Sequence, residues 1–288
     1  MTIYCFHHSV DWDGYASAAI VKYFNPSAIM WPYNYGQFFP FDKIEPDDTV
    51  YMVDISIQPY TEMLRLYELL KKNLIILDHH ASFIESDVGK NLKEKMGSKF
   101  YFVEGFAACE LTWMYCHQSN NVPKVIRLLG QYDAWRDKIE KMKDSDTAWG
   151  DVLAFQFGMR LDELEYGLVT RLINAEKAVD QILLDGRSIL RYQDSQNKIS
   201  MHHAFDATIQ GLRCLCLNTG HRNSQTFVSR WDREKYDVMV AFSMDKEKKW
   251  SYSFYTDKPE VDVSKIASHF GGGGHKQAAG CKSDILIF

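Results

Sequence analysis

The chain has 288 residues, of which 46% are hydrophobic and 14% aromatic, and its formal net charge is −5. This length suits two domains better than one compact core, and the composition excludes a disordered chain. The charge argues against a protein that binds long duplex nucleic acid by electrostatics alone, and no apolar run approaches the roughly 20 residues that span a bilayer.

The first third of the chain alternates between short apolar runs and helical patterns. TIYCF (2–6), TVYMVDI (49–55) and NLIILD (73–78) predict strands, and DGYASAAIVKYF (13–24) and PYTEMLRLYELLKK (59–72) have the apolar spacing of helices. Strands that alternate with helices predict a parallel sheet with crossover helices. Ligands of such a sheet bind at the carboxyl ends of its strands.

Helical patterns continue at 109–118 and 122–135, with Pro123 placed to open the second. The long helical region 161–205 is expected to be interrupted at Gly186 and to carry the domain connection. Beyond it, three strand patterns and a helix at 263–270 predict a second sheet, which the last five residues are expected to close.

We therefore predict an α/β protein with an N-terminal parallel-sheet catalytic domain over 1–185. A helical linker over 186–204 joins it to a smaller α/β substrate-binding domain over 205–288, and the active site is expected in the cleft between the two domains.

The six cysteines occur without a C-x-x-C pair, which favours reduced structural thiols over a disulfide framework. The N-terminal residues lack the basic and apolar segments of a secretory signal. We therefore expect a cytoplasmic protein that has no membrane segment.

Acidic side chains gather at the ends of the three predicted strands. Asp11 and Asp13 follow the first strand, Asp54 lies at the end of the second and Asp78 at the end of the third. Carboxylates that meet at one sheet edge repel one another unless a cation lies between them. A single D-x-D is more often a helix cap, and a lone Asp after a strand a turn residue. The two histidines after Asp78, however, have no such local reason to be there.

Together these side chains offer carboxylate and imidazole ligands, the set that suits Mn²⁺, whereas a structural zinc site would more often use cysteine. Four carboxylates carry more charge than one divalent ion balances. This favours two metal ions about 3.5–4 Å apart, an arrangement that promotes displacement at phosphorus.

The glycine run in FGGGGHKQAAG (270–280) is the remaining motif. Such a run is often a flexible linker, but this one follows a predicted amphipathic helix and precedes H-K-x-A-A-G. Its glycines would let backbone N–H groups approach phosphate oxygens, with polar or positive contacts from His275 and Lys276.

On these residues the chain resembles the DHH phosphoesterases that carry the DHH-associated C-terminal domain, over nearly its whole length. The glycine run matches the signature of that domain. The four ordered motifs of the family match His7, Asp11 and Asp13 (first), Asp54 (second), Asp78, His79 and His80 (third) and Asp133 (fourth).

The resemblance implies two bound Mn²⁺ ions, with Mg²⁺ or Co²⁺ as substitutes. The implied ligands are His7, Asp11 and Asp54 for one ion, and Asp13, Asp54, His79 and Asp133 for the other. Asp78 would orient a neighbouring ligand, and His80 would contact the scissile phosphate. His8 has no role in the family pattern, so His7 is the predicted ligand of the two adjacent histidines.

The resemblance also implies a phosphodiesterase that hydrolyses short oligonucleotides (nanoRNA) or linear dinucleotides to mononucleotides. Relatives that degrade short oligoribonucleotides commonly carry an Arg on the strand before the glycine signature, where this chain has Tyr255. A phosphate contact is then lost or supplied elsewhere, or Tyr255 stacks on a base. The predicted substrate-binding residues are Gly272, Gly273, Gly274, His275, Lys276, Tyr255 and Arg222.

Two alternatives remain open on sequence grounds. The same metal centre would serve a cyclic-dinucleotide or nucleoside-bisphosphate phosphoesterase. A non-catalytic nucleotide-binding regulator is disfavoured, because every expected metal-site position is intact. Oligomeric state and the choice between RNA and DNA do not follow from these residues.

Overall fold

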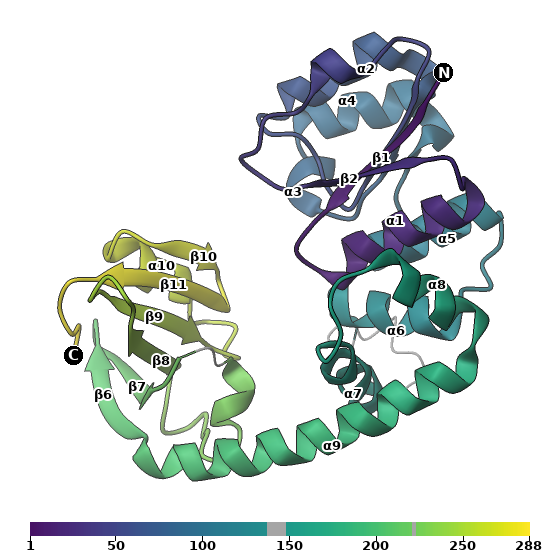
Figure 1. Ribbon diagram of the computed structural model, residues 1–288. Helices are drawn as coiled ribbons and strands as arrows, with labels where there is room; N and C mark the ends of the chain where they lie inside the picture. Colours follow the sequence, from purple (N-terminus) through teal and green to yellow (C-terminus); the bar gives the residue numbers. More distant parts are fainter. Residues whose placement is uncertain (137–147, 221–222) are drawn as a thin grey trace. The chain divides into compact units, whose positions relative to one another are not determined.

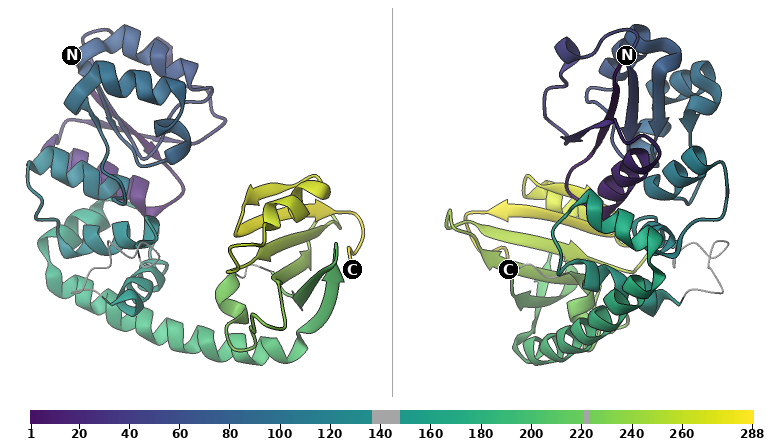
Figure 2. Two further views of the ribbon diagram at one scale, coloured as in Figure 1. Left: turned by 180° about the vertical axis from the view of Figure 1, so that it is seen from behind. Right: turned by 45° about the vertical axis from the view of Figure 1, so that its right-hand side comes forward.

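The computed structural model describes residues 1–136, 148–220 and 223–288, apart from the side chain of His275. These residues form two compact units, Met1–Ile189 and Leu190–Phe288. Figures 1 and 2 show their elements from three directions.

The first unit is built on a parallel sheet with the strand order β2-β1-β3-β4-β5. Its strands are β1 (Ile3–His8), β2 (Ile29–Tyr33), β3 (Thr49–Val53), β4 (Leu74–Leu77) and β5 (Phe100–Tyr101). Its helices are α1 (Trp12–Phe24), α2 (Thr61–Leu70), α3 (Ala81–Ile84), α4 (Asp87–Met96), α5 (Ala108–His117), α6 (Lys124–Asp133), α7 (Trp149–Met159) and α8 (Tyr166–Asn174), followed by α9 (Glu176–Ser200), which runs on into the second unit. Short 3₁₀ turns lie at Phe41–Lys43, Lys71–Asn73 and Gly97–Lys99.

Helices cover both faces of this sheet (Figure 1). On one face, buried side chains such as Phe6 and Met52 pack against α2 and α3 through Leu66 and Phe83. On the other face, Cys5, Val53 and Leu77 pack against α1. Because strand side chains alternate between the two faces, consecutive residues of β1 belong to different cores.

The predicted interruption of the long helix at Gly186 is wrong, because α9 continues through this residue. A Cβ atom at Gly186 would lie 1.7 Å from the carbonyl oxygen of Ala154 in α7. The glycine therefore allows two helices to approach closely, and it does not end one.

The second unit contains a six-stranded mixed sheet with the order β10-β11-β9-β8-β7-β6. Strands β7 and β8 are parallel and the other neighbours antiparallel. Its elements are β6 (Phe205–Ile209), β7 (Leu212–Asn218), β8 (Val238–Met244), β9 (Trp250–Tyr255), α10 (Val263–His269), β10 (Gly273–His275) and β11 (Ala278–Ser283), with 3₁₀ turns at Met201–His203 and Ser224–Phe227.

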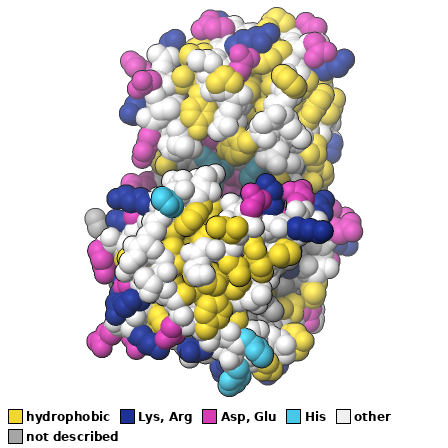
Figure 3. All heavy atoms as spheres, turned by 90° about the vertical axis from the view of Figure 1, so that its left-hand side faces the viewer, with side chains coloured by type: hydrophobic (Ala, Val, Ile, Leu, Met, Phe, Trp, Pro, Cys, Tyr) yellow, Lys and Arg dark blue, Asp and Glu magenta, His cyan; other side chains and the backbone are white. Residues whose placement is uncertain are grey.

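Helix α10 packs on one face of this sheet, where Val263 and Ile266 meet Val240 and Phe254. The last five residues do not add a strand, contrary to expectation. The ring of Phe288 instead lies 4.9 Å from that of Phe242 and 5.4 Å from that of Phe205. Figure 3 shows hydrophobic side chains gathered on this unit.

The predicted α/β class, with a parallel sheet followed by a second sheet, is confirmed. Among the helices that the structure describes, none is long and apolar enough to cross a membrane. The six cysteines are free thiols, and five of them are buried.

Candidate metal centre

The three strands with acidic carboxyl ends are neighbours in the first sheet. In the register, His7 of β1 pairs with Val53 of β3, and Val53 pairs with Leu77 of β4. The polar residues that follow these pairs therefore lie at one edge of the sheet. The amide of Asp54 donates to the carbonyl of Leu77 at 3.0 Å, which holds two of these strand ends together.

The side chains at this edge form three overlapping groups of possible metal ligands. Within each group the ligand atoms lie within 4.8 Å of one another. The groups are His8, Asp11 and Asp54; Asp13, His79 and Asp133; and Asp54, His79 and His80.

The structure places His8 in this cluster, and the prediction of His7 is corrected accordingly. The Nδ1 atom of His8 lies 2.7 Å from Asp11 and 3.5 Å from Asp54. The His7 ring instead turns toward the opposite face of the sheet, where it is fully buried. The physical reason is the alternation of side chains along β1, which sends adjacent residues to opposite faces.

Asp54 is the central carboxylate of the cluster. It is 1% exposed, and neither of its oxygens has a well-formed hydrogen bond to a described residue, although His8 and His79 nitrogens lie 3.5 and 3.4 Å away. Its φ of 59° is in the left-handed region, which costs a non-glycine residue about 1–3 kcal/mol. Burial raises the pKa of Asp54, although the neighbouring histidines oppose the rise. A buried, under-bonded carboxylate of this kind fits a cation ligand.

Asp13, in the first turn of α1, faces the N-terminus of α5. Its two oxygens accept hydrogen bonds from the amides of Ala108 and Cys109 at 3.0 and 2.8 Å. Burial, with repulsion from Asp54 and Asp133, raises the pKa of Asp13 well above its usual value. The helix N-terminus relieves part of this unfavourable charge, and a bound cation would relieve the rest.

Asp11 caps α1 and also faces His8. Its side chain accepts from the amide of Gly14 at 2.9 Å. Burial acts against ionisation, but the contacts with His8 and Gly14 hold the pKa of Asp11 below its usual value. Helix capping and cation binding are thus compatible roles for the same carboxylate.

Histidine and aspartate side chains alternate around the cluster. The Nε2 atom of His79 lies 3.0 Å from Asp133 and 3.6 Å from Asp13. Burial opposes protonation, but Asp133 and Asp54 raise the pKa of His79 to about 12. Asp11 and Asp54 likewise raise the pKa of His8, against burial, to about 10. The histidine protons therefore balance carboxylate charge that metal ions would otherwise balance.

A hydrogen bond to Asp78 fixes the orientation of the His80 ring. The Nδ1 atom of His80 lies 2.7 Å from Asp78 Oδ1, which also accepts from the His80 amide at 3.1 Å. Asp78 is fully buried, yet its hydrogen bond to His80 lowers the pKa of Asp78. Burial lowers the pKa of His80, but Asp78 outweighs it and the net shift is upward.

Two further features next to the cluster were missed from the sequence. The ring of Tyr35 lies 5.7 Å from that of His8 and 6.2 Å from that of His80. The buried carboxylate of Glu110 pairs with Arg136 and so ties α5 to the segment that follows Asp133. Neither gave a signal, since Tyr35 follows a strand that was not predicted and Glu110 lies in an ordinary helical pattern.

The predicted substrate-binding residues lie in the second unit. The glycine run is partly a strand, because β10 and β11 pair through Gly273, Gly274 and the backbone of His275. A Cβ atom at Gly274 would lie 2.5 Å from Cα of Ala279, so the close approach of these strands needs glycine.

Tyr255 on β9 pairs with Ala278 on β11, which pairs in turn with His275. Strand β11 therefore lies between Tyr255 on β9 and the glycines of β10. Gly272 precedes β10 and Lys276 follows it, whereas Arg222 lies outside the described residues.

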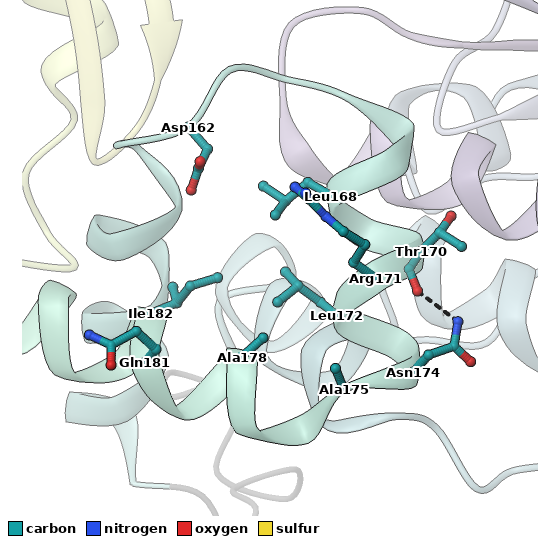
Figure 4. A pocket seen from close by; sticks show the side chains of 10 residues that line it. All are labelled: Asp162, Leu168, Thr170, Arg171, Leu172, Asn174, Ala175, Ala178, Gln181 and Ile182. Atoms are coloured by element: carbon teal, nitrogen blue, oxygen red, sulfur yellow. Dashed lines mark hydrogen bonds between the residues drawn. The ribbon is translucent and has the colours of Figure 1, made fainter.

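A pocket of about 660 Å³ lies apart from the cluster, between α8 and α9 (Figure 4). Leu168, Leu172, Ala178 and Ile182 give it a mainly apolar wall. Among the residues that the structure describes, none of those predicted for the site lines this pocket, and no group of possible metal ligands does.

The C-terminal part of the chain matches a family model. Residues 217–285 match the DHHA1 domain. An uncharacterized protein, R106, of Acanthamoeba polyphaga mimivirus is 26% identical over 254 residues, which cover 83% of this chain. The chain spans only 54% of the length of that relative.

Two solved structures have a similar fold over 99% of this chain. One is a pGpG-specific phosphodiesterase, PggH, from Vibrio cholerae, with 14% identity, a TM-score of 0.53 and 94% of its own chain covered. The other is an exopolyphosphatase-related protein from Bacteroides fragilis, with 12% identity, a TM-score of 0.51 and 88% covered. The match over residues 217–285 confirms the predicted DHH-associated domain in the C-terminal part of the chain. The two solved structures show that the fold of nearly the whole chain is shared with these proteins.

Proposed function

We propose that this chain, with its DHHA1 domain and the fold of DHH phosphoesterases, is a manganese-dependent phosphodiesterase that hydrolyses short oligonucleotides and linear dinucleotides to mononucleotides. The observation that carries the proposal is the under-bonded Asp54, which two of the three ligand groups share. A carboxylate so placed suits a ligand that bridges two metal ions.

The proposed ligands follow from the groups in the structure. His8, Asp11 and Asp54 hold one ion. The second is held by Asp54 with three further side chains, Asp13, His79 and Asp133. When bound, two such ions would activate a water and stabilise the oxygen that leaves phosphorus.

His80 and Asp78 supply the proposed acid–base chemistry of the protein itself. The Asp78 carboxylate orients the His80 ring and favours its protonated form. A protonated imidazole at this edge contacts the negatively charged phosphate and donates a proton to the leaving oxygen. Asp78 acts through His80 and is a positioning residue.

Manganese is proposed because the donor set mixes two imidazoles with four carboxylates. Mg²⁺ and Co²⁺ accept overlapping donors and are proposed as substitutes. The substrate class is supported by the net charge of −5, which disfavours long polyanions, and by the pGpG specificity in the name of one structural relative. Residues 270–280 and Tyr255 are proposed to contact the nucleotide, and the free cysteines agree with a cytoplasmic location.

The test is turnover of labelled RNAs of about two to ten residues, with Mn²⁺, alongside pGpG, cyclic dinucleotides, nucleoside bisphosphates and inorganic polyphosphate. We expect the two-residue substrates to be hydrolysed fastest. Equal rates at all RNA lengths would contradict the preference for short substrates, and preferred turnover of cyclic dinucleotides, bisphosphates or polyphosphate would reassign the substrate.

The metal mechanism is tested with Asp54→Asn, which keeps the size of the side chain and removes its charge. We expect at least a roughly 100-fold loss of activity and weaker Mn²⁺ binding. Asp47→Asn is the matched control, because Asp47 lies in an exposed turn with its side chain 77% exposed. An Asp54→Asn protein with the activity of this control would exclude the proposed mechanism.

A further inference from the structure

His7 is fully buried next to the metal cluster but belongs to none of its ligand groups. Both of its ring nitrogens have polar partners. Nδ1 lies 2.8 Å from the carbonyl oxygen of His8, and Nε2 lies 2.7 Å from the hydroxyl of Tyr166. The ring therefore links the start of α8 to the main chain of a proposed metal ligand.

The direction of both hydrogen bonds follows from their chemistry. In its neutral form the His7 ring has one N–H group. A carbonyl oxygen only accepts, which places the proton on Nδ1. The Nε2 atom is then an acceptor, and the Tyr166 hydroxyl donates to it.

The carbonyl of His8 is confined from a second side by Gly14. A Cβ atom at Gly14 would lie 2.2 Å from the His8 oxygen, so the first turn of α1 lies directly against this peptide group. The side chain of His8 is attached next to this peptide group, and its Nδ1 atom lies close to the carboxylates of Asp11 and Asp54. A shift of the peptide group would therefore move the imidazole away from both carboxylates.

We propose that His7 and Tyr166 are positioning residues, which fix the His8 peptide group and so direct the His8 ring into the metal cluster. Outer hydrogen bonds that orient a ligand affect metal affinity strongly. The inference rests on the proposed function for the identity of the ion. Its geometry also explains why two adjacent histidines are present, one as ligand and one as support.

The experiment compares Tyr166→Phe with Tyr15→Phe. The two tyrosine rings stack on each other at 5.2 Å, and both contact the His7 ring, but only Tyr166 bonds to its nitrogen. Each variant removes one hydroxyl group and keeps the ring. Mn²⁺ affinity of the metal-free proteins is measured by calorimetry, and thermal unfolding is measured in EDTA.

We expect Tyr166→Phe to weaken Mn²⁺ binding by about 10-fold and Tyr15→Phe to leave it nearly unchanged. Excess Mn²⁺ should restore much of the activity of Tyr166→Phe, because the proton chemistry at His80 is intact. Equal Mn²⁺ affinity in the two variants would overturn the inference, as would a loss of thermal stability in EDTA without a loss of affinity.

If Tyr166→Phe does not fold, His7→Asn gives the same measurement. The asparagine side chain is shorter than histidine. Its amide is expected to donate to the His8 carbonyl and to lose the bond to Tyr166. A wild-type protein that fails to bind Mn²⁺ would contradict the proposed function, whereas variants that bind like wild type contradict only the positioning role.

Discussion

The sequence indicates which carboxylates meet in the metal cluster more clearly than it indicates which histidines join them. Asp11, Asp13 and Asp54 each follow a predicted strand, so their convergence follows from the topology of a parallel sheet. The choice between His7 and His8 depends on which face of β1 meets the acidic residues. Both faces of this sheet are covered by helices, so hydrophobic alternation, which normally identifies the inner face, gives no answer.

Protons should leave the protein when metal binds. His8 and His79 have pKa values raised to about 10 and about 12 in the metal-free protein, so both are protonated at pH 7. A metal ligand must be the neutral imidazole, so binding at pH 7 should release about two protons, and affinity should increase as pH rises.

Calorimetry in buffers of different ionisation enthalpy measures this release. His79→Asn should reduce it by about one proton, since it removes one of the two groups. A binding heat that is the same in every buffer would contradict the assignment of protonated histidines.

At the scale of elements, the strands that were missed have physical reasons for their weak signals. Strand β2 is an edge strand that contains Pro32, and four of its five residues are exposed or half-buried. Strand β5 has only two residues. Their presence depends on pairing with β1 and β4, which no local pattern encodes.

The contact between α7 and α9 leads to a prediction about Gly186. Gly186→Ala should lower the free energy of unfolding by about 1–3 kcal/mol, although alanine is the better helix former, because the new Cβ overlaps the carbonyl of Ala154. Urea unfolding followed by circular dichroism measures the change.

Gly150→Ala in α7 is the matched control. A Cβ atom there has no atom within 4 Å, so this change should be neutral or stabilising by up to about 1 kcal/mol. If the two variants were equally stable, the close approach at Gly186 would not be a constraint in solution.

For the whole molecule, every proposed metal ligand lies within Met1–Ile189. Mn²⁺ should therefore stabilise this unit, by about 2.7 kcal/mol for each ion at a free concentration of 100 Kd. Hydrogen exchange should slow in peptides from residues 1–189, near the carboxyl ends of β1, β3 and β4. Peptides from residues 205–288 should exchange at the same rate with and without metal.

Asp54→Asn provides the control, since Mn²⁺ should no longer slow exchange in it. Equal protection of both units in the wild-type protein would contradict a metal centre built by the first unit alone.

The overall division into a parallel α/β part and a second sheet was predictable, because it depends on long patterns of strands and helices. The predicted boundaries at 185 and 204, and an active site between the domains, stay predictions. The pocket between α8 and α9 had no counterpart in the sequence, because its wall combines the faces of two helices that differ little from ordinary core patterns.

The contact of the Asp13 side chain with the first amides of α5 also affects the order in which the chain folds. The first amides of a helix have no partner within that helix, and here two of them depend on a side chain 95 and 96 residues earlier. This helix therefore acquires its completed first turn only after the segment of β1 and α1 has reached it. The acidic edge that is proposed to bind the cation and the capped first turn of α5 thus depend on the same carboxylate.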